Sequence, residues 1–413
     1  MTMNAKRRRV QEKLAALPGV RPVRRPISPD SREEFDLYYV RTGRKSAHPL
    51  VIIPGGPGVA SVQMYRRLRR RAAAAGLDVI MVEHRGVGMS RHDDSGEDLP
   101  PEAITVNQVV DDIAAVLDDA RVDSAVIYGA SYGTYIASGF GVQHPNRVRA
   151  MILDSPLLSR HDIVIVRRAI RRLLLRGDSP ETAALAPKMR KLVDAGVMTA
   201  AATQVVATIY GYGGAELLER QLDLLLDGRK LLWWALSRFA TLSNLPFRYE
   251  EDLVSRIAFR ELNYAAEPDG LPLDPAVAER EARTQTATFE DEPYDLVAEM
   301  PYFGWPTAVV SGGRDLITPL AVAERVAALL PHAVLLKLPS MAHSALDFRE
   351  PAAIEIARAV WRGELDGLTA KAPALDALPE RPELRLLWKA IAVAAVVEGA
   401  LPIPAVLRRI TRA

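Results

Sequence analysis

Short, almost wholly apolar runs alternate with amphipathic stretches over the first 156 residues of the chain. The apolar runs lie at 50–53, 78–82, 124–128 and 150–153, and each one ends at turn-forming or polar residues. Residues 104–120 carry apolar side chains at helical spacing, and 35–40 alternates enough to predict one more strand. Short runs with almost no polar residue are typical of strands covered on both faces. Their alternation with helices predicts an α/β fold with a mostly parallel, doubly wound sheet.

The alternation stops after Pro156, and from there to about residue 300 the pattern is helical. Helices are expected at 163–175, 181–195, 215–225, 231–242 and 275–284. Strand-like runs return at 307–310 and 333–337, followed by a helix at 352–361. We therefore expect a core formed by 31–156 and 301–365, with residues 157–300 inserted as a helical cap.

The two ends of the chain are expected to lie outside this core. Residues 1–30 are basic and contain proline, which predicts a helix and an irregular arm. Residues 366–413 hold an alanine- and proline-rich linker and an apolar helix at 384–407. A helix without a polar face is usually buried or in contact with lipid, but Lys389 and Glu398 interrupt it too often for a membrane span. We expect it to pack on the cap or on a second subunit in a homodimer. Weak membrane-surface contact helped by Arg408, Arg409 and Arg412 is the alternative.

Composition excludes several classes of function. The 413 residues carry a formal net charge of +2, which gives no reason to expect a nucleic-acid partner. With no cysteine, the chain has no disulfide, no thiolate metal site and no cysteine nucleophile, and we expect neither a metal nor a cofactor. The basic start of the chain has no apolar run behind it, so we expect no secretory signal and a cytoplasmic location.

A Gly-x-Ser-x-Gly motif at 129–133 places Ser131 between a predicted strand and a predicted helix. A strand that turns sharply into a helix at this motif needs small residues on both sides of the serine, and it leaves the serine hydroxyl exposed at the end of the strand. Ser131 is therefore the candidate nucleophile.

A serine nucleophile needs a histidine base and an acid that orients it, in the chain order serine, acid, histidine. Of the two histidines after the sheet resumes, His332 precedes a strand, whereas His343 follows the last strand at the edge where Ser131 lies. Asp315 follows the strand at 307–310 directly and is the predicted acid, with Asp154 as the runner-up. An oxyanion also needs two backbone N–H groups. We expect one from Tyr132 and the other from Gly55, with Gly56 as the alternative.

Together these residues resemble the proline iminopeptidase and tripeptidyl aminopeptidase branch of the α/β-hydrolases, a serine peptidase family with a helical cap. The matching pieces are the glycine- and proline-rich loop at 54–58, Glu-x-Arg-Gly-x-Gly-x-Ser at 83–90, the elbow at Ser131, Gly-x-Asp-x-x-Thr-Pro at 313–319 and His343. The resemblance covers roughly 35–155 and 300–362. One departure is Pro54, where the family often has histidine.

The resemblance implies an α/β-hydrolase fold and hydrolysis of an amide or ester beneath the cap, through an acyl-enzyme on Ser131. The substrate would be a small peptide or another small acyl compound. Cap glutamates bind the substrate amine in such aminopeptidases, which makes Glu261 and Glu267 candidates. Trp233 and Trp234 are candidates for an acyl pocket, and Tyr132 is expected to touch substrate. An esterase or amide hydrolase of a small metabolite is the alternative, and a non-catalytic binding protein is disfavoured by the intact triad.

Overall fold

The computed structural model describes residues 2–239, 244–282 and 288–401. Its centre is a sheet of eight strands in the order β1-β2-β4-β3-β5-β6-β9-β10. The first two strands pair antiparallel with each other, β2 pairs antiparallel with β4, and the pairs from β4 to β10 are parallel. The strands are β1 (Val20–Pro26), β2 (Glu34–Thr42), β3 (Leu50–Ile53), β4 (Val79–Val82), β5 (Ala125–Ala130), β6 (Val148–Asp154), β9 (Thr307–Gly312) and β10 (Ala333–Leu338). The mostly parallel sheet predicted from the apolar runs is confirmed.

Helices cover both faces of this sheet because successive strand side chains point to opposite sides. Along β3, Val51 packs into the core on one face, whereas Leu50 and Ile52 pack into the core on the other. The first face is covered by α4 (Val106–Asp119), α5 (Tyr132–Gln143), α13 (Leu296–Glu299) and α14 (Leu320–Leu329). The second is covered by α1 (Ala5–Ala15), α2 (Ser61–Met64), α3 (Arg66–Ala74), α16 (Glu350–Trp361) and α17 (Leu368–Asp376), while the short α15 (Ala345–Phe348) precedes α16.

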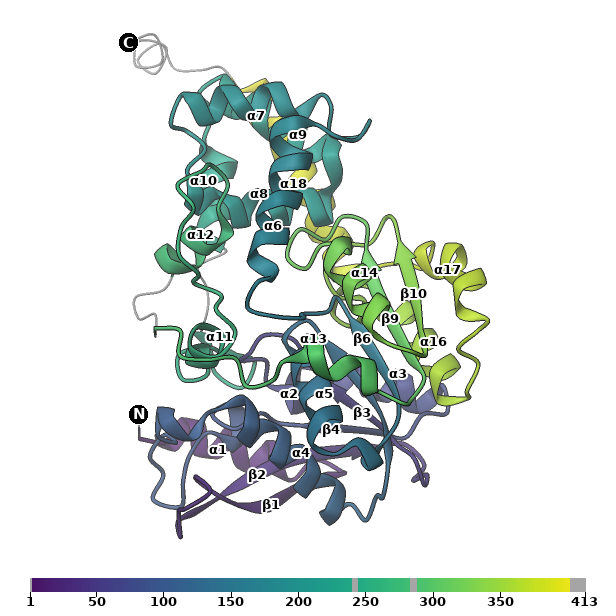
Figure 1. Cartoon of the computed structure of the whole chain (residues 1–413). Coiled ribbons are helices and arrows are strands. Elements are labelled where there is room, and N and C mark those ends of the chain that lie inside the picture. Colours follow the sequence, from purple (N-terminus) through teal and green to yellow (C-terminus); the bar gives the residue numbers. More distant parts are fainter. Residues whose placement is uncertain (1, 240–243, 283–287, 402–413) are drawn as a thin grey trace.

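The cap lies over the end of the sheet at which β6 finishes (Figure 1). It has a hydrophobic core of its own. Its helices are α6 (Asp162–Arg171), α7 (Leu185–Asp194), α8 (Thr203–Thr208), α9 (Gly214–Leu226), α10 (Leu231–Phe239), α11 (Ser255–Arg260) and α12 (Pro275–Ala282). A two-stranded hairpin of β7 (Asn244–Leu245) and β8 (Tyr249–Glu250) interrupts them. The inserted helical character was predicted, whereas this hairpin, α8 and α11 were not. The ends of the helices predicted at 231–242 and 275–284 fall partly outside the described residues.

Two predictions about the ends of the chain are wrong. The arm within residues 1–30 is not irregular after its helix, because β1 pairs along its whole length with β2 and belongs to the sheet. Its two prolines, Pro22 and Pro26, are tolerated since β1 is an edge strand. The predicted linker forms α17, which buries Leu368 and Leu375 against the core.

The apolar C-terminal helix is α18 (Pro382–Ala400), and it packs on the cap helices α9 and α10. Ile391 and Ala395 join the cap core, and the ring of Trp388 stacks on Tyr212 at 5.9 Å between ring centroids. Packing on the chain's own cap is therefore confirmed for one side of this helix. No helix within the described ranges is long and apolar enough to cross a membrane.

Candidate active site

Ser131 stands at the turn between β5 and α5 with a backbone that few side chains adopt, at φ 51° and ψ −122°. Such a conformation costs about 1–3 kcal/mol and persists only where the surrounding structure enforces it. The flanking glycines explain how the turn closes. A Cβ at Gly129 would lie 2.2 Å from the carbonyl oxygen of Gly133, and one at Gly133 would lie 2.2 Å from that of Ile53. The sharp strand-to-helix turn predicted from the motif is therefore present.

The loop after β10 brings His343 to this serine. The distance from Ser131 Oγ to His343 Nε2 is 2.8 Å, and His343 Nδ1 lies 2.9 Å from Asp315 Oδ2. His332 lies at the opposite end of β10, where its carbonyl oxygen accepts the N–H of Thr307. The structure thus brings together the three residues that the sequence proposed as nucleophile, base and acid.

Asp315 is buried and held by its own loop. Its Oδ1 accepts the backbone N–H groups of Ile317 at 2.8 Å and Thr318 at 2.9 Å, while the Thr318 hydroxyl donates to Oδ2 at 2.9 Å. The glycines before it are needed for a close approach, because a Cβ at Gly312 would lie 2.2 Å from the carbonyl oxygen of Ala342. The loops that carry the acid and the base are therefore packed directly against each other.

Burial and ion pairing act on the pKa values of this pair in opposite directions. Burial lowers the pKa of His343, but the charge and hydrogen bond of Asp315 outweigh it, so the net pKa lies above the ordinary histidine value. Burial likewise raises the pKa of Asp315, and the His343 charge and hydrogen bond reverse this to a net lowering. Asp315 therefore stays ionised and stabilises a positive charge on His343.

Asp154, the runner-up acid, contacts the base loop rather than the base. Its carboxylate accepts the N–H groups of Ala345 at 3.1 Å and Leu346 at 2.9 Å, and the Tyr128 hydroxyl at 2.9 Å. Burial raises its pKa to about 6. Its backbone oxygen also accepts the N–H of Ser131 at 2.8 Å. One residue thus ties the nucleophile turn to the loop that ends in His343.

The glycine-rich loop after β3 lies beside the serine. A Cβ at Gly55 would be 3.2 Å from Ser131 Cβ, and Gly56 lines the same cavity as Ser131 and His343. Tyr132 follows the serine at the first position of α5. The three predicted oxyanion-hole residues therefore surround Ser131, and their role as N–H donors stays a prediction.

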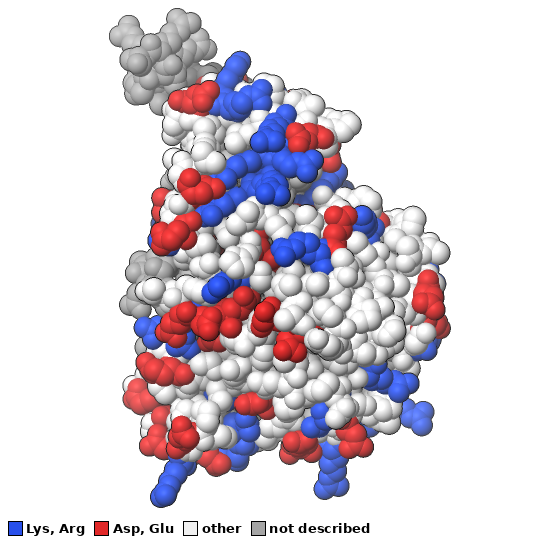
Figure 2. All heavy atoms as spheres, in the orientation of Figure 1, with Lys and Arg blue, Asp and Glu red and all other residues white. Residues whose placement is uncertain are grey.

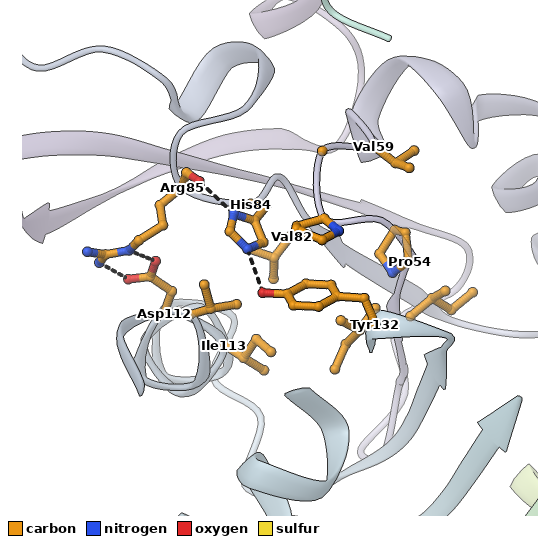
Figure 3. A pocket seen from close by; sticks show the side chains of 14 residues that line it. Pro54, Val59, Val82, His84, Arg85, Asp112, Ile113 and Tyr132 are labelled. Carbon is orange, nitrogen blue, oxygen red and sulfur yellow. Dashed lines mark hydrogen bonds and ion pairs between the residues drawn. The ribbon is translucent and has the colours of Figure 1, made fainter. Parts of the chain in front are cut away.

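The Tyr132 side chain does not line the large cavity, so the expectation that Tyr132 touches substrate is wrong for its side chain. Figure 3 shows its ring directed at His84, beside a small cavity of about 30 Å³. The Tyr132 hydroxyl lies 3.0 Å from His84 Nε2, and His84 Nδ1 lies 2.5 Å from the carbonyl oxygen of Arg85. Burial lowers the pKa of His84 to about 4, so the ring is neutral. Nδ1–H then donates to Arg85 and Nε2 accepts the tyrosine proton, which fixes the residue after the nucleophile.

The large cavity has a volume of about 1130 Å³ and is lined by Ser131 and His343 on the core side and by the cap opposite. Trp233 lines it, as predicted for an acyl pocket. Trp234 does not, because it turns outward and is 63% exposed, so the prediction for Trp234 is wrong.

The two glutamates implied by the resemblance are also absent from the residues that line the cavity. Glu261 is buried, where it accepts the N–H of Val106 at the start of α4 at 2.9 Å and pairs with Arg260 at 3.0 Å. Glu267 is exposed and pairs with Arg280 at 2.8 Å. Glu261 therefore ties the cap to α4, Glu267 forms a surface ion pair within the cap, and the prediction is corrected for both.

Other carboxylates line the cavity. Carboxylates outnumber guanidinium groups among the lining residues, which include Asp162, Glu251, Asp252, Glu279 and Glu281 against Arg160 and Arg256. Sequence reasoning missed them, because the acidic residues of the cap are numerous and only the folded arrangement shows which ones face inward.

Sequence reasoning also missed a connection between the cap hairpin and the glycine-rich loop. The Ala60 N–H donates to the Arg248 carbonyl at 2.9 Å, and the Glu250 N–H donates to the Gly58 carbonyl at 2.8 Å. The Glu250 carboxylate is buried and accepts two N–H groups of Arg7, each at 2.9 Å, and the N–H of Gly88 at 3.0 Å. This one carboxylate joins the N-terminal helix, the loop after β4 and the cap.

Two residues of the motif at 83–90 have structural roles. The buried Glu83 carboxylate accepts the N–H groups of Val62 at 2.8 Å and Met89 at 3.2 Å, and burial raises its pKa to about 7. Arg85 forms two hydrogen bonds with Asp112, both at 2.7 Å, as Figure 3 shows beside His84. These contacts fix the loop that supports His84 and Tyr132.

Comparison with known proteins agrees with this architecture. Residues 48–177 match the family model described as the alpha/beta hydrolase fold. The chain is 25% identical over 127 residues to a proline iminopeptidase of Arabidopsis thaliana, and 24% identical over 128 residues to one of Neisseria meningitidis serogroup A. These stretches cover 30% and 31% of this chain, and only 30% and 39% of the relatives.

Among solved structures, the proline iminopeptidase of Mycobacterium smegmatis is similar with a TM-score of 0.49 and 16% identity, over 85% of this chain and 100% of that one. The sheet order, the elbow and the family match define the class. The chain has the α/β-hydrolase fold, and the curated proteins to which it is similar include proline iminopeptidases, as the motifs predicted.

Proposed function

We propose that the protein is a serine hydrolase that cleaves an amide bond through an acyl-enzyme on Ser131, and that it removes an N-terminal residue or short peptide from a small peptide. The observation that carries the proposal is the continuous chain of hydrogen bonds from Ser131 through His343 to Asp315, with distances of 2.8 Å and 2.9 Å. These distances are short enough for direct proton transfer from the serine.

In the first half of the reaction, Ser131 Oγ attacks the substrate carbonyl carbon while its proton passes to His343 Nε2. The negative charge that forms on the carbonyl oxygen is stabilised by backbone N–H groups of Tyr132 and of Gly55 or Gly56. The positive charge on His343 is stabilised by Asp315. The C–N bond then breaks, and the leaving amine takes the proton from His343.

In the second half, a water molecule attacks the acyl carbon and gives a proton to His343. The bond to Ser131 Oγ breaks and the serine regains its proton from His343. The product leaves as a carboxylic acid, which loses its proton to solvent and becomes a carboxylate. Each turnover therefore consumes one water and returns the three residues to their starting protonation states.

The cavity lining supports a substrate with a free amine. Asp252 is paired with Arg91 at 2.8 Å, and the other lining carboxylates still outnumber the two lining arginines. This balance favours a cationic group by Coulomb attraction, which is stronger in a partly enclosed site than in water. The proline iminopeptidases among the curated relatives point in the same direction. Glu251 lines the cavity close to the glycine-rich loop, since its side chain lies beside Gly58. We propose that it helps to bind the substrate ammonium group.

An esterase or an amide hydrolase of a small metabolite is the second candidate. Apolar residues from both sides of the cavity favour it, since they suit a hydrophobic acyl group. They include Leu157, Ile163, Val166, Ile170, Trp233 and Leu316.

Labelling with a fluorophosphonate, followed by assays with matched substrates, separates these candidates. An aminopeptidase should label at Ser131 and should hydrolyse aminoacyl anilides only when their amine is free. Glu251→Gln should then raise KM for the free-amine substrates and leave the amine-acetylated substrates unchanged. Equal hydrolysis of free and acetylated substrates, or activity on p-nitrophenyl esters alone, would instead indicate the esterase. Absence of labelling would contradict both candidates.

A further inference from the structure

Helix α18 covers the cap with one side and leaves an apolar side exposed. The side that packs inward carries Trp388, Ile391 and Ala395. On the outward side, Leu386 is 67% exposed and Val393 is 62% exposed, and Val396 and Val397 are exposed as well. A surface helix normally turns polar residues outward, so the exposed apolar side needs an explanation.

Helix α10 carries further exposed apolar side chains near the end of α18. The Glu398 carboxylate accepts the N–H groups of Leu231 at 2.9 Å and Leu232 at 2.8 Å, so the end of α18 meets the start of α10. Leu231 is 69% exposed there, and Trp234 is exposed one turn further along. We call Leu231, Trp234, Leu386, Val393, Val396 and Val397 the α10–α18 surface.

The charges on this part of the cap are mainly positive. Both acidic residues of α18 are engaged, Glu383 with Arg67 at 2.6 Å and Glu398 with the start of α10. Arg385 and Lys389 are exposed on the helix. The loop from α9 to α10 contains Asp227, Arg229 and Lys230, so it adds one net positive charge.

The sequence that follows α18 is also basic and apolar. Residues 402–413 lie outside the described part of the structure, and their sequence contains three arginines, four large apolar residues and no acidic residue.

We propose that the α10–α18 surface docks the protein on an anionic lipid membrane. Exposed aliphatic side chains, a tryptophan and flanking lysine and arginine are the features that hold a helix in the plane of a membrane interface. A second copy of the chain fits less well. In a two-fold dimer both copies would use this surface, so the positive charges of both would enter one interface in which the acidic residues of α18 are already engaged, whereas an anionic lipid surface complements them.

A second basic area on the cap provides the rival explanation for any vesicle binding. Figure 2 shows lysine and arginine side chains gathered over the part of the cap where Figure 1 places α6, whereas α18 lies behind α9 in that view. The groove there is lined by Arg167, Arg168, Arg171, Arg172 and Arg176. Arg167, Arg171 and Arg172 pair with aspartates, which leaves less net charge than the sequence indicates.

Sedimentation of the full-length protein with phosphatidylcholine vesicles, with and without phosphatidylglycerol, tests the proposal. The wild type should bind the anionic vesicles, and the triple variant Leu386→Ser, Val393→Ser, Val397→Ser should bind about tenfold more weakly or worse. The matched control is Val164→Ser with Leu271→Ser, at positions 51% and 57% exposed beside the arginine groove. This control should bind like the wild type.

A second variant separates the contribution of the positive charges to vesicle binding from that of the apolar side chains. Arg385→Gln with Lys389→Gln keeps the apolar side chains and should weaken binding to the anionic vesicles about fivefold for each charge removed, with little change on neutral ones. Fluorophosphonate labelling of Ser131 and the melting temperature should match the wild type in all variants, which shows that they fold.

Three results would overturn the proposal. The first is a wild type that does not sediment with anionic vesicles. The second is binding that the triple variant leaves unchanged and the groove control abolishes. The third is a dimer in light scattering that the triple variant dissociates without any vesicle binding by the wild type.

Discussion

The sheet core and the cap of this protein are built by different rules. In the core, every residue of β3 and β5 is buried, and the loops that carry Ser131, Asp315 and His343 are fixed by close backbone packing. In the cap, the helices are interrupted by π-helical turns at 172–176 and 209–213, and large apolar side chains are exposed on α10 and α18. The rigidly packed core thus holds Ser131, Asp315 and His343, whereas the less regular cap supplies most of the lining of the cavity beside them.

The largest effect should come from removing the nucleophile in the core. Ser131→Ala should lower kcat/KM by about 10³-fold or more in a folded protein, because the oxyanion hole and substrate binding alone remain. Adding His343→Ala should cost little more, since both residues serve one step. His332→Ala is the matched control and should keep its activity. A fully active Ser131→Ala enzyme would show that the nucleophile is misassigned.

Asp315→Asn should have the next largest effect. It should lower kcat/KM on the order of 10³-fold or more and change the pH profile. His343 must be neutral to accept the serine proton, so activity falls as pH drops through its pKa. Because Asp315 raises that pKa, the acid limb of the wild type should lie above the ordinary histidine value. In the variant, the limb should move to lower pH. Profiles of kcat/KM against pH measure this, and an unmoved limb would contradict the pairing.

Breaking the contact between Arg7 in the core and Glu250 in the cap should have a smaller effect. Arg7→Met removes the bidentate partner of the buried Glu250 carboxylate and should lower the free energy of unfolding by about 1–3 kcal/mol. Because Glu250 also holds the loop at Gly58, kcat should fall more than KM changes. Arg8→Met is the control one residue away on α1. Denaturant unfolding measures the first effect and steady-state kinetics the second. A destabilised variant with unchanged kcat would show that the Arg7–Glu250 contact stabilises the fold but does not affect catalysis.

The smallest effect should be on the pH dependence of stability. Burial raises the pKa of Glu83 to about 7 in the folded state, above its value in the unfolded chain. Between the two values the folded state binds more protons, so stability falls as pH rises through this range. Glu83→Gln cannot ionise and should flatten the slope of melting temperature against pH between about 5 and 7. An equally steep slope in the variant would assign it to other groups.

The core could be predicted from the sequence much better than the cap. The core strands are continuous apolar runs, and the order of Ser131, Asp315 and His343 along such strands determines that they meet at one edge of the sheet. By contrast, β1 was missed because its arginines and prolines hide the strand pattern. The cap residues Glu261, Glu267 and Trp234 were misplaced for a different reason. Which face of a cap helix turns toward the cavity depends on contacts with distant residues such as Val106 and Arg280, and these leave no local signal.

The hairpin that joins the cap to Gly58 and Ala60 has a consequence for protein engineering. The simplest exchange of caps between two α/β-hydrolases would cut the chain where the cap leaves and re-enters the sheet, here near residues 157 and 300. In this protein the transplanted piece would also include Arg248 and Glu250, whose partners lie on the glycine-rich loop and on the N-terminal helix. A chimera made with those two cuts alone would lose hydrogen bonds to the loop beside Ser131. A working exchange therefore has to move the hairpin, the loop at 54–60 and α1 as one unit.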